Sequence, residues 1–277
     1  MRKCVMTAAA AVALLAAAPA AGDGGPAAGG VQGWDGIARD GVRYVAVPAP
    51  GWTSVQVIRR NGGRVLRFMN IRGSFGVPLV AFAGGSDALL GDDRTLVLGE
   101  PSVSPVLRRT STFVLVDTWR MRELSRIRLK GHFAFDAASP EGRYLYFTEY
   151  TSQSKLAEYR VRAFDLHSGR LLPKIVADRS SWETTMVGVP ISRARRDGWA
   201  YTLYAGNGGR PFIHALDTRN VSSVCIDLPW RQDPRNIFDF RLHWDGDGHL
   251  VVAGLHGRAL VTVDRRELRI LSSVANP

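Results

Sequence analysis

The segments SPEGRYLYF (residues 139–147) and YRVRAFDLHSGRLL (residues 159–172) decide the fold of this chain. The first joins a turn containing Gly142 to an apolar run, and the second is an apolar run that ends at Asp165, before a turn containing Gly169. Short runs of Val, Leu, Phe and Tyr that are broken by Gly, Asp and Pro are typical of strands and turns. The two segments therefore predict consecutive antiparallel strands.

The first segment recurs about every fifty residues along the chain. Its five copies are RDGVRYVAV (39–47), GDDRTLVL (91–98), SPEGRYLYF (139–147), RRDGWAYTL (195–203) and GDGHLVVAG (246–254). The turn positions Gly41, Asp93, Gly142, Gly198 and Gly248 are 52, 49, 56 and 50 residues apart. A fixed period in this range indicates stacked repeat units.

The second segment recurs in step with the first and ends at an Asp in four of the five copies, which are Asp117, Asp165, Asp217 and Asp264. Arg59 takes this place in the first copy. An Asp at the end of a strand can accept hydrogen bonds from the backbone of the following turn. This pattern predicts a hairpin after each of these strands.

Each repeat has room for four strands, which in the third copy are residues 132–137, 143–147, 160–164 and 171–176. A four-stranded meander repeated radially is a β-propeller blade. We therefore predict an all-β chain with a β-propeller of five four-stranded blades, or of six if one has been merged or missed. Residues 34–37 are the candidate inner strand of the first blade, and the sequence shows no obvious strand that closes the ring.

The N-terminal region has the organisation of an export signal. Arg2 and Lys3 precede an apolar run over residues 5–18, and Ala18-Pro19-Ala20 matches a small-x-small cleavage pattern. We expect a signal peptide over residues 1–20, cleaved or retained as an anchor, a flexible Gly/Ala/Pro linker over 21–33, and the propeller domain over 34–277.

The segments SPEGRYLYF and YRVRAFDLHSGRLL resemble the YVTN and WD-repeat-like propellers of bacterial exported proteins. Residues 75–98 and 201–218 look like a group of uncharacterised secreted actinobacterial proteins. The resemblance covers nearly the whole chain after the leader, and it implies the propeller fold. It brings no set of catalytic residues, because propellers host many unrelated activities.

The motifs of common enzymes and metal sites do not occur in the sequence. It lacks a GxSxG elbow, an HExxH helix, a Walker loop and paired-cysteine spacing. The stretch WDGDGH (244–249) has the Asp and Gly of a calcium loop without its later ligands. Cys225 lies between Val224 and Ile226, which predicts a buried and inert thiol. We expect no catalytic residue, no metal site and no cofactor.

Loops between the second and third strands of every blade emerge on one face of a propeller, and four of the five contain a basic residue. The formal net charge of +11 favours an anionic partner, although the arginines are also consistent with a compositional bias. An extra loop after the third repeat holds an exposed-looking Trp. The binding candidates are Trp52, Glu100, Arg108, Arg109, Lys155, Trp182, Arg210 and Arg258.

Inner strands line the channel of a propeller, and their polar residues are candidates for a central site. These are Asp87, Asp136, Arg193, Asp239 and Arg241. Three carboxylates that converge on the axis could hold a cation, which would polarise a carbonyl and activate water. The simpler interpretation is that they bond strand ends and water.

We expect an exported, non-enzymatic binding or scaffold module that is secreted or associated with the cell envelope. Its partner would be a protein or an anionic polymer of the envelope, and not a nucleic acid. We further expect a monomer without a membrane span once the signal is removed. The alternative is a lactonase-like hydrolase with a cation in the central channel.

Overall fold

The computed structural model describes residues 31–32, 36–102, 106–155, 157–231 and 236–274. These residues form strands β1 to β21 and three 3-10 helices of three residues each, with no α-helix among them. The expected leader and most of the expected linker lie outside the described residues, as do Trp34 and Asp35. In the part of the chain that is described, no helix has the length and apolar character needed to span a bilayer.

The first half of the chain forms two antiparallel units. Unit 1 consists of β2 (Ile37–Arg39), β3 (Val42–Ala49), β4 (Trp52–Arg59) and β5 (Val65–Arg72). Unit 2 consists of β7 (Thr95–Gly99), β8 (Thr110–Asp117) and β9 (Arg122–Lys130). Residues 86–90 take the inner position of unit 2, because Leu89 bridges Leu96 and the Val97 N–H donates to the Ala88 carbonyl at 2.7 Å.

The second half forms three units of four strands each. Unit 3 consists of β10 (His132–Ala138), β11 (Tyr144–Tyr150), β12 (Glu158–Asp165) and β13 (Arg170–Val176). Unit 4 consists of β14 (Met186–Arg196), β15 (Trp199–Gly206), β16 (Phe212–Asp217) and β17 (Ser222–Asp227). Unit 5 consists of β18 (Arg241–Trp244), β19 (Leu250–Ala253), β20 (Ala259–Asp264) and β21 (Arg269–Ser273).

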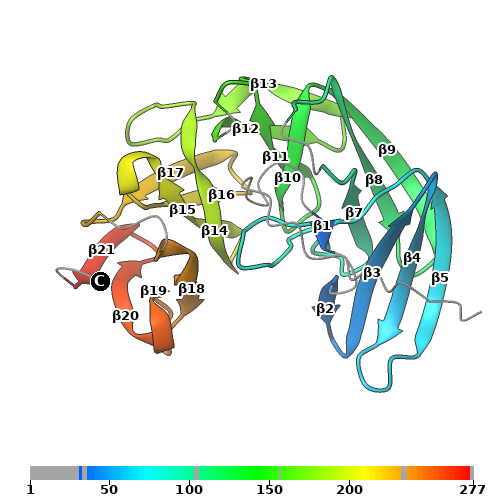
Figure 1. Ribbon diagram of the computed structural model, residues 1–277, viewed down its shortest axis with the longest axis horizontal. Helices are drawn as coiled ribbons and strands as arrows, with labels where there is room; N and C mark the ends of the chain where they lie inside the picture. Colours follow the sequence, from blue (N-terminus) through cyan, green and yellow to red (C-terminus); the bar gives the residue numbers. More distant parts are fainter. Residues whose placement is uncertain (1–30, 33–35, 103–105, 156, 232–235, 275–277) are drawn as a thin grey trace, which may run out of the picture.

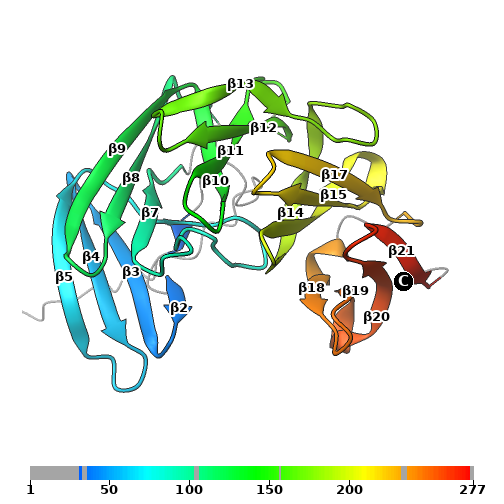
Figure 2. The ribbon, with the colours of Figure 1, turned by 180° about the vertical axis from the view of Figure 1, so that it is seen from behind.

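These units confirm the predicted all-β fold with the four-stranded meander of a β-propeller. The units follow one another around an arc that ends with unit 1 and unit 5 (Figures 1 and 2). No ladder between described strands joins unit 1 to unit 5, and neither end lends a strand to the other. A closed ring of five blades therefore stays a prediction.

The Asp residues at the strand ends hold the hairpins as predicted. Oδ1 of Asp117 accepts hydrogen bonds from the N–H groups of Trp119 and Arg120, at 2.9 and 2.8 Å. Oδ1 of Asp264 does the same for Arg266 and Glu267, at 2.7 and 2.8 Å. At the other two hairpins, Asp165 accepts the N–H of His167, and Asp217 accepts the N–H groups of Arg219 and Asn220. In unit 1, which has Arg59 instead, Gly62 and Gly63 turn the chain with positive φ.

The last residues of the expected flexible linker are part of the fold. Val31 and Gln32 form β1 and pair with β6 (Val77–Pro78) in a separate two-stranded sheet. Gly76 allows this approach, because a Cβ at that position would lie 2.5 Å from the Val31 side chain. The chain is thus anchored to the fold two residues before Gly33, where we had placed the end of the linker.

Apolar side chains fill the space between consecutive units. One cluster joins units 1, 2 and 3, a second joins units 3 and 4, and a third joins units 4 and 5. In β4 the buried positions alternate with partly exposed ones, because successive side chains of a strand point to opposite faces. In β10 every residue is buried, because apolar clusters lie on both of its faces.

The contact between units 2 and 3 depends on a glycine in the repeated turn. A Cβ at Gly91 would lie 2.0 Å from the Pro140 carbonyl oxygen of the next unit, whereas one at the equivalent Gly246 would meet nothing within 4 Å. Gly91→Ala should lower the free energy of unfolding by about 1–3 kcal/mol, because the backbones must separate. Gly246→Ala should change it by less than about 0.5 kcal/mol. Urea unfolding measures both, and equal stability of the two variants would contradict this packing.

Candidate functional site

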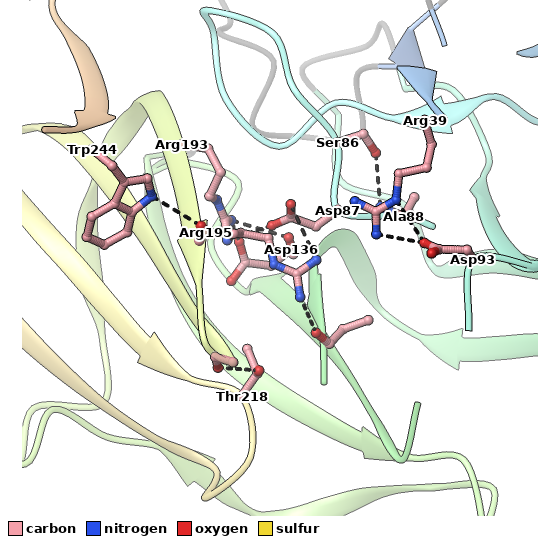
Figure 3. A network of polar contacts seen from close by, with 12 residues as sticks. Arg39, Ser86, Asp87, Ala88, Asp93, Asp136, Arg193, Arg195, Thr218 and Trp244 are labelled. Atoms are coloured by element: carbon pink, nitrogen blue, oxygen red, sulfur yellow. Dashed lines mark hydrogen bonds and ion pairs between the residues drawn. The ribbon is translucent and has the colours of Figure 1, made fainter. Parts of the chain in front are cut away.

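The centre of the fold is occupied by one arginine between two carboxylates (Figure 3). Arg193 on β14 forms an ion pair with Asp136 on β10 and lies 3.3 Å from Oδ2 of Asp87, which precedes β7. The Arg193 side chain is 4% exposed. Burial by itself lowers the pKa of Arg193, but the charges of Asp136 and Asp87 outweigh this effect and raise it, so the guanidinium stays protonated.

Two features that the sequence motifs did not reveal bring these residues together. Strand β10 has a bulge between Phe135 and Ala137, and a bulge redirects the side chain at that point, here Asp136. Residues 79–85, which precede the inner segment of unit 2, cross to β14, where the N–H groups of Phe82 and Ala83 donate to the carbonyls of Pro190 and Ile191. This segment crosses the middle of the arc (Figure 1) and leads directly into Asp87.

A second arginine, Arg195, extends the central ion pairs toward unit 3. Its guanidinium lies 3.6 Å from Oδ1 of Asp87 and donates to the Ala138 carbonyl at 3.0 Å. Trp244 of unit 5 donates from its ring nitrogen to the Arg195 carbonyl at 3.2 Å. Through these contacts the central cluster connects units 2, 3, 4 and 5.

Of the predicted channel residues, Asp87, Asp136 and Arg193 meet, and Asp239 and Arg241 stay apart. Asp239 is an exposed residue of a 3-10 helix (Ile237–Asp239) and not of an inner strand, because the chain only becomes extended at Phe240. Arg241 begins β18, and its guanidinium donates to the carbonyls of Phe238 and Phe240. The two carboxylates that do converge face the guanidinium groups of Arg193 and Arg195, which balance their charge where the hydrolase alternative would place a metal ion.

Buried phenols and an imidazole surround Asp136 at the boundary of units 3 and 4. The Tyr159 and Tyr204 rings are stacked with centroids 5.6 Å apart, and Tyr150 packs against Tyr159 at 5.9 Å. A cavity of about 10 Å³ lies beside Asp136, Tyr150 and Tyr204. This is close to the smallest space that holds one water molecule.

His214 on β16 is the buried imidazole of this cluster. Its ring packs edge-on against Tyr204, and Nε2 has no hydrogen-bond partner among the described residues. Burial lowers the pKa of His214 from 6.5 to about 4, while the charge of Asp136 acts in the opposite direction. His214 is therefore neutral in the folded protein at neutral pH.

The low pKa of His214 makes the stability depend on pH. As the pH falls, the unfolded chain binds the proton first, so this contribution is complete above about pH 6.5 and is lost toward pH 4. The protein should lose about 2 kcal/mol of unfolding free energy between pH 7.5 and 5. His214→Gln should remove most of that loss, and the exposed control His167→Gln should retain it. Urea unfolding at both pH values measures this, and an unchanged pH dependence in His214→Gln would contradict it.

Loss of the central arginine should destabilise the fold strongly. Arg193→Met leaves Asp87 and Asp136 buried without their counter-charge, which should cost about 3–5 kcal/mol of unfolding free energy. Adding Asp87→Asn and Asp136→Asn to the same chain should restore much of this loss, because the amides remove the uncompensated charges. Urea unfolding followed by tryptophan fluorescence gives both values. A loss below about 1 kcal/mol in the single variant would show that Arg193 does not hold the centre.

The predicted loops lie at one end of the strands, at positions marked by a repeated hydrogen bond. In units 1, 2 and 4 the residue directly after the fourth strand donates its N–H to the loop between the second and third strands, and in unit 3 a residue of the next strand, β14, does so. The pairs are Gly73 to Gly51, Gly131 to Arg109, Gly188 to Ala157 and Leu228 to Pro211, at 2.8 to 3.0 Å. We call the surface formed by the described residues of these loops and of the corresponding loop of unit 5 the loop face; they are residues 49–52, 100–102, 106–109, 151–155, 157, 206–211 and 254–258.

Glu100 and Arg108 stabilise the longest loop of the loop face. The guanidinium of Arg108 lies 3.4 Å from the Glu100 carboxylate and donates to the Glu100 and Pro101 carbonyls. The same carboxylate accepts a hydrogen bond from the Thr112 N–H at 3.1 Å. Both side chains are half-buried, and their charged groups bind each other and the loop backbone.

Other predicted residues of the loop face are open to solvent. Arg109, Arg210 and Arg258 are exposed and have no ion pair or side-chain hydrogen bond among the described residues. Lys155 is exposed and pairs with Glu158 at 3.2 Å. Trp52 is also exposed, at 46%. The three free guanidinium groups are the cations that a partner could reach.

Trp182 lies in a turn that is fixed without any contribution from its own ring. Asp178 accepts hydrogen bonds from Ser180 and Ser181, and the Arg179 N–H donates to Ser223 on β17 at 2.9 Å. The Trp182 backbone has φ of 62°, which is rare for a bulky residue, and its side chain is 70% exposed. The turn thus presents an aromatic ring to solvent next to the start of β17.

A groove on the loop face lies between units 3 and 4. It has a volume of about 420 Å³ and is lined by Ala157, by residues 187–189 and by residues 205–209. Most of this lining is small or apolar, and Arg210 follows it directly in the chain. The sequence did not indicate the groove, since its walls are glycines, alanines and valines that carry no distinctive motif.

Two other sequence candidates have structural explanations. Asp245 accepts the His249 N–H at 2.7 Å and lies 3.1 Å from its ring, so the stretch 244–249 is a closed hairpin turn. Asp245, Asp247 and His249 have ligand atoms within 4.8 Å of one another, but they are partly or fully exposed. Cys225 is partly buried and not fully buried as predicted. Its desolvation and the nearby charge of Asp178 raise the pKa of the thiol well above its usual range.

No known protein-family profile matches the sequence, and no curated protein matches it either. Among solved structures, the chain is similar to hydrazine synthase of Kuenenia stuttgartiensis, with 14% identity, a TM-score of 0.48, and 77% of this chain and 65% of that chain covered. The Dos1 propeller is 13% identical with a TM-score of 0.48, and the match covers 84% of this chain and 56% of that one. TolB from Acinetobacter baumannii is 14% identical with a TM-score of 0.43, and the match covers 84% of this chain and 53% of that one. The chain thus spans between about half and two thirds of the length of these proteins. Similarity this distant transfers no function.

Proposed function

We propose that this protein is an exported, non-enzymatic propeller module that binds an anionic polymer of the cell envelope on its loop face. The observation that carries the proposal is the set of free guanidinium groups of Arg109, Arg210 and Arg258 on that face. Arginine presents a planar fork of donors that suits carboxylates and phosphates. Export rests on the signal-like N-terminus of the sequence.

The contrast between the centre and the loop face supports a binding role. The central charges are paired with one another, and the cavity beside them has room for about one water. The loop face has a groove of about 420 Å³ and three arginines that form no ion pair with the acidic side chains that the structure describes. A polymer with repeated negative charges can contact several loops at once, which a rigid scaffold holds in fixed positions.

The proposal predicts salt-dependent binding that depends on these three arginines. The triple variant Arg109→Ala, Arg210→Ala, Arg258→Ala should bind soluble polyphosphate at least about tenfold more weakly, and its affinity should depend less steeply on salt. Its unfolding free energy should change little, because the three side chains are exposed and form no ion pair or side-chain hydrogen bond with the residues that the structure describes. Calorimetric titration at several salt concentrations measures both affinity and salt dependence.

Arg39→Ala is the matched control, because Arg39 is an exposed arginine at the opposite end of the strands that already pairs with Asp93. It should bind polyphosphate like the unchanged protein. Equal affinity of the triple variant and the unchanged protein would refute the loop face as the site. Binding that persists at molar salt would refute an electrostatic partner, since exposed charges are then screened within about 3 Å.

A further inference from the structure

The outer hairpins of units 1 and 2 carry a group of cations that the proposed function does not use. Arg59, Arg60 and Arg64 lie on the β4–β5 hairpin, and Arg120 and Arg122 lie on the β8–β9 hairpin. All five are exposed, and none has an ion pair or a side-chain hydrogen bond among the described residues. The two nearest acids of the β8–β9 hairpin are already engaged. Glu123 pairs with Arg126 at 2.8 Å, and Asp117 accepts the N–H groups of its own turn and faces Arg94 at 3.8 Å. These hairpins therefore form an unbalanced basic surface.

Arg67 joins the two hairpins into one surface. Its Nε donates to the Thr118 carbonyl at 3.1 Å, and its guanidinium lies 4.7 Å from the centre of the Trp119 ring. A guanidinium over a tryptophan ring is attracted by the negative face of the π-system. The contact fixes Trp119 beside the unit 1 hairpin while 63% of its surface remains exposed.

Apolar side chains are exposed along with these cations. Phe68 on β5 is 65% exposed, and Val65 at the start of the same strand is 45% exposed. Because side chains alternate along a strand, Arg67 and Phe68 point to opposite faces of unit 1. The β4–β5 hairpin thus has one exposed aromatic ring on each side. We call Arg59, Arg60, Arg64, Val65, Arg67, Phe68, Trp119, Arg120 and Arg122 the rim.

The rim is separate from the loop face. Both of its hairpins connect the third strand of a unit to the fourth, whereas the loop face connects the second strand to the third. In an antiparallel unit these two kinds of connection lie at opposite ends of the strands. The β4–β5 hairpin projects from the end of the arc in both views (Figures 1 and 2).

We propose that the rim docks on the surface of an anionic lipid bilayer. Lipid headgroups of negative charge attract each Arg near the surface, and Trp is enriched at the boundary between headgroups and acyl chains. A bilayer also buries Phe68 and Val65, which a soluble polyanion would leave in water. The combination of free arginines with exposed aromatic and aliphatic side chains therefore favours a lipid surface over a dissolved polymer. Docking through the rim leaves the loop face directed away from the bilayer.

Vesicle sedimentation tests this proposal with the purified protein. Vesicles of phosphatidylcholine with 30 mol% phosphatidylglycerol should retain the protein at 0.1 M salt, and vesicles of phosphatidylcholine alone should not. The variant Arg59→Ala, Arg60→Ala, Arg64→Ala should bind the anionic vesicles roughly a hundredfold more weakly. Trp119→Ser and Phe68→Ser should each weaken binding at least about fivefold, and Trp119 fluorescence should shift to the blue on vesicle binding.

The loop-face variant Arg109→Ala, Arg210→Ala, Arg258→Ala is the matched control, because it removes the same number of positive charges. It should bind anionic vesicles like the unchanged protein, and the rim variant should bind polyphosphate like the unchanged protein. An equal loss of vesicle binding in both triple variants would refute the rim and indicate a general effect of net charge. Unchanged binding in Trp119→Ser and Phe68→Ser, together with displacement by polyphosphate, would show that the rim binds a soluble polyanion. Far-ultraviolet circular dichroism of each variant verifies that the fold is retained.

Discussion

The ion pairs of Arg193 connect the middle of this protein, and the arrangement of the units depends on them. Asp87 comes from unit 2, Asp136 from unit 3 and Arg193 from unit 4, so each unit supplies one charge to the cluster. Removing an ion from water into a protein interior costs several kcal/mol, so none of the three is stable there without the others. The described ends of the arc share no ladder, and its inner contacts therefore do more to fix the units than they would in a sealed ring.

The filled centre has a consequence for where a partner can bind. Residues 79–85 cross to β14, the tyrosines pack against one another, and the remaining central cavity has room for about one water. A partner larger than a water molecule does not fit this cavity, whereas the outer surfaces offer more room. The two ends of the strands offer different surfaces, since the loop face combines free arginines with a groove of small residues, and the rim combines them with exposed aromatic rings.

Much of the architecture followed from the repeat because the signals are local. An Asp at the end of a strand bonds the turn two or three residues later, so its role depends on a short segment alone. The strands of the third unit match their predicted ranges to within a few residues. For example, the strand predicted over 132–137 is β10, which spans His132–Ala138. Asp87, Asp136 and Arg193 were also predicted to lie inside, but their ion pairs depend on a bulge, which recurs in β14, and on a crossing segment, and neither follows from neighbouring residues alone. Asp239 was misplaced because it lies in a 3-10 helix that ends before β18 begins at Arg241.

The sequence by itself determined the period, the strand and turn character of each unit, the hairpin caps and the excess of arginine. It did so because alternation, turn chemistry and charge are properties of neighbouring residues. Only the tertiary structure decided which arginines are paired and which are free. Arg108 and Arg109 are adjacent in sequence, yet one is bonded to Glu100 and Pro101 and the other is exposed to solvent. The difference arises because the fold places an acid and a carbonyl beside the first side chain and leaves the second exposed. Such proximity is set by the tertiary arrangement of the loop.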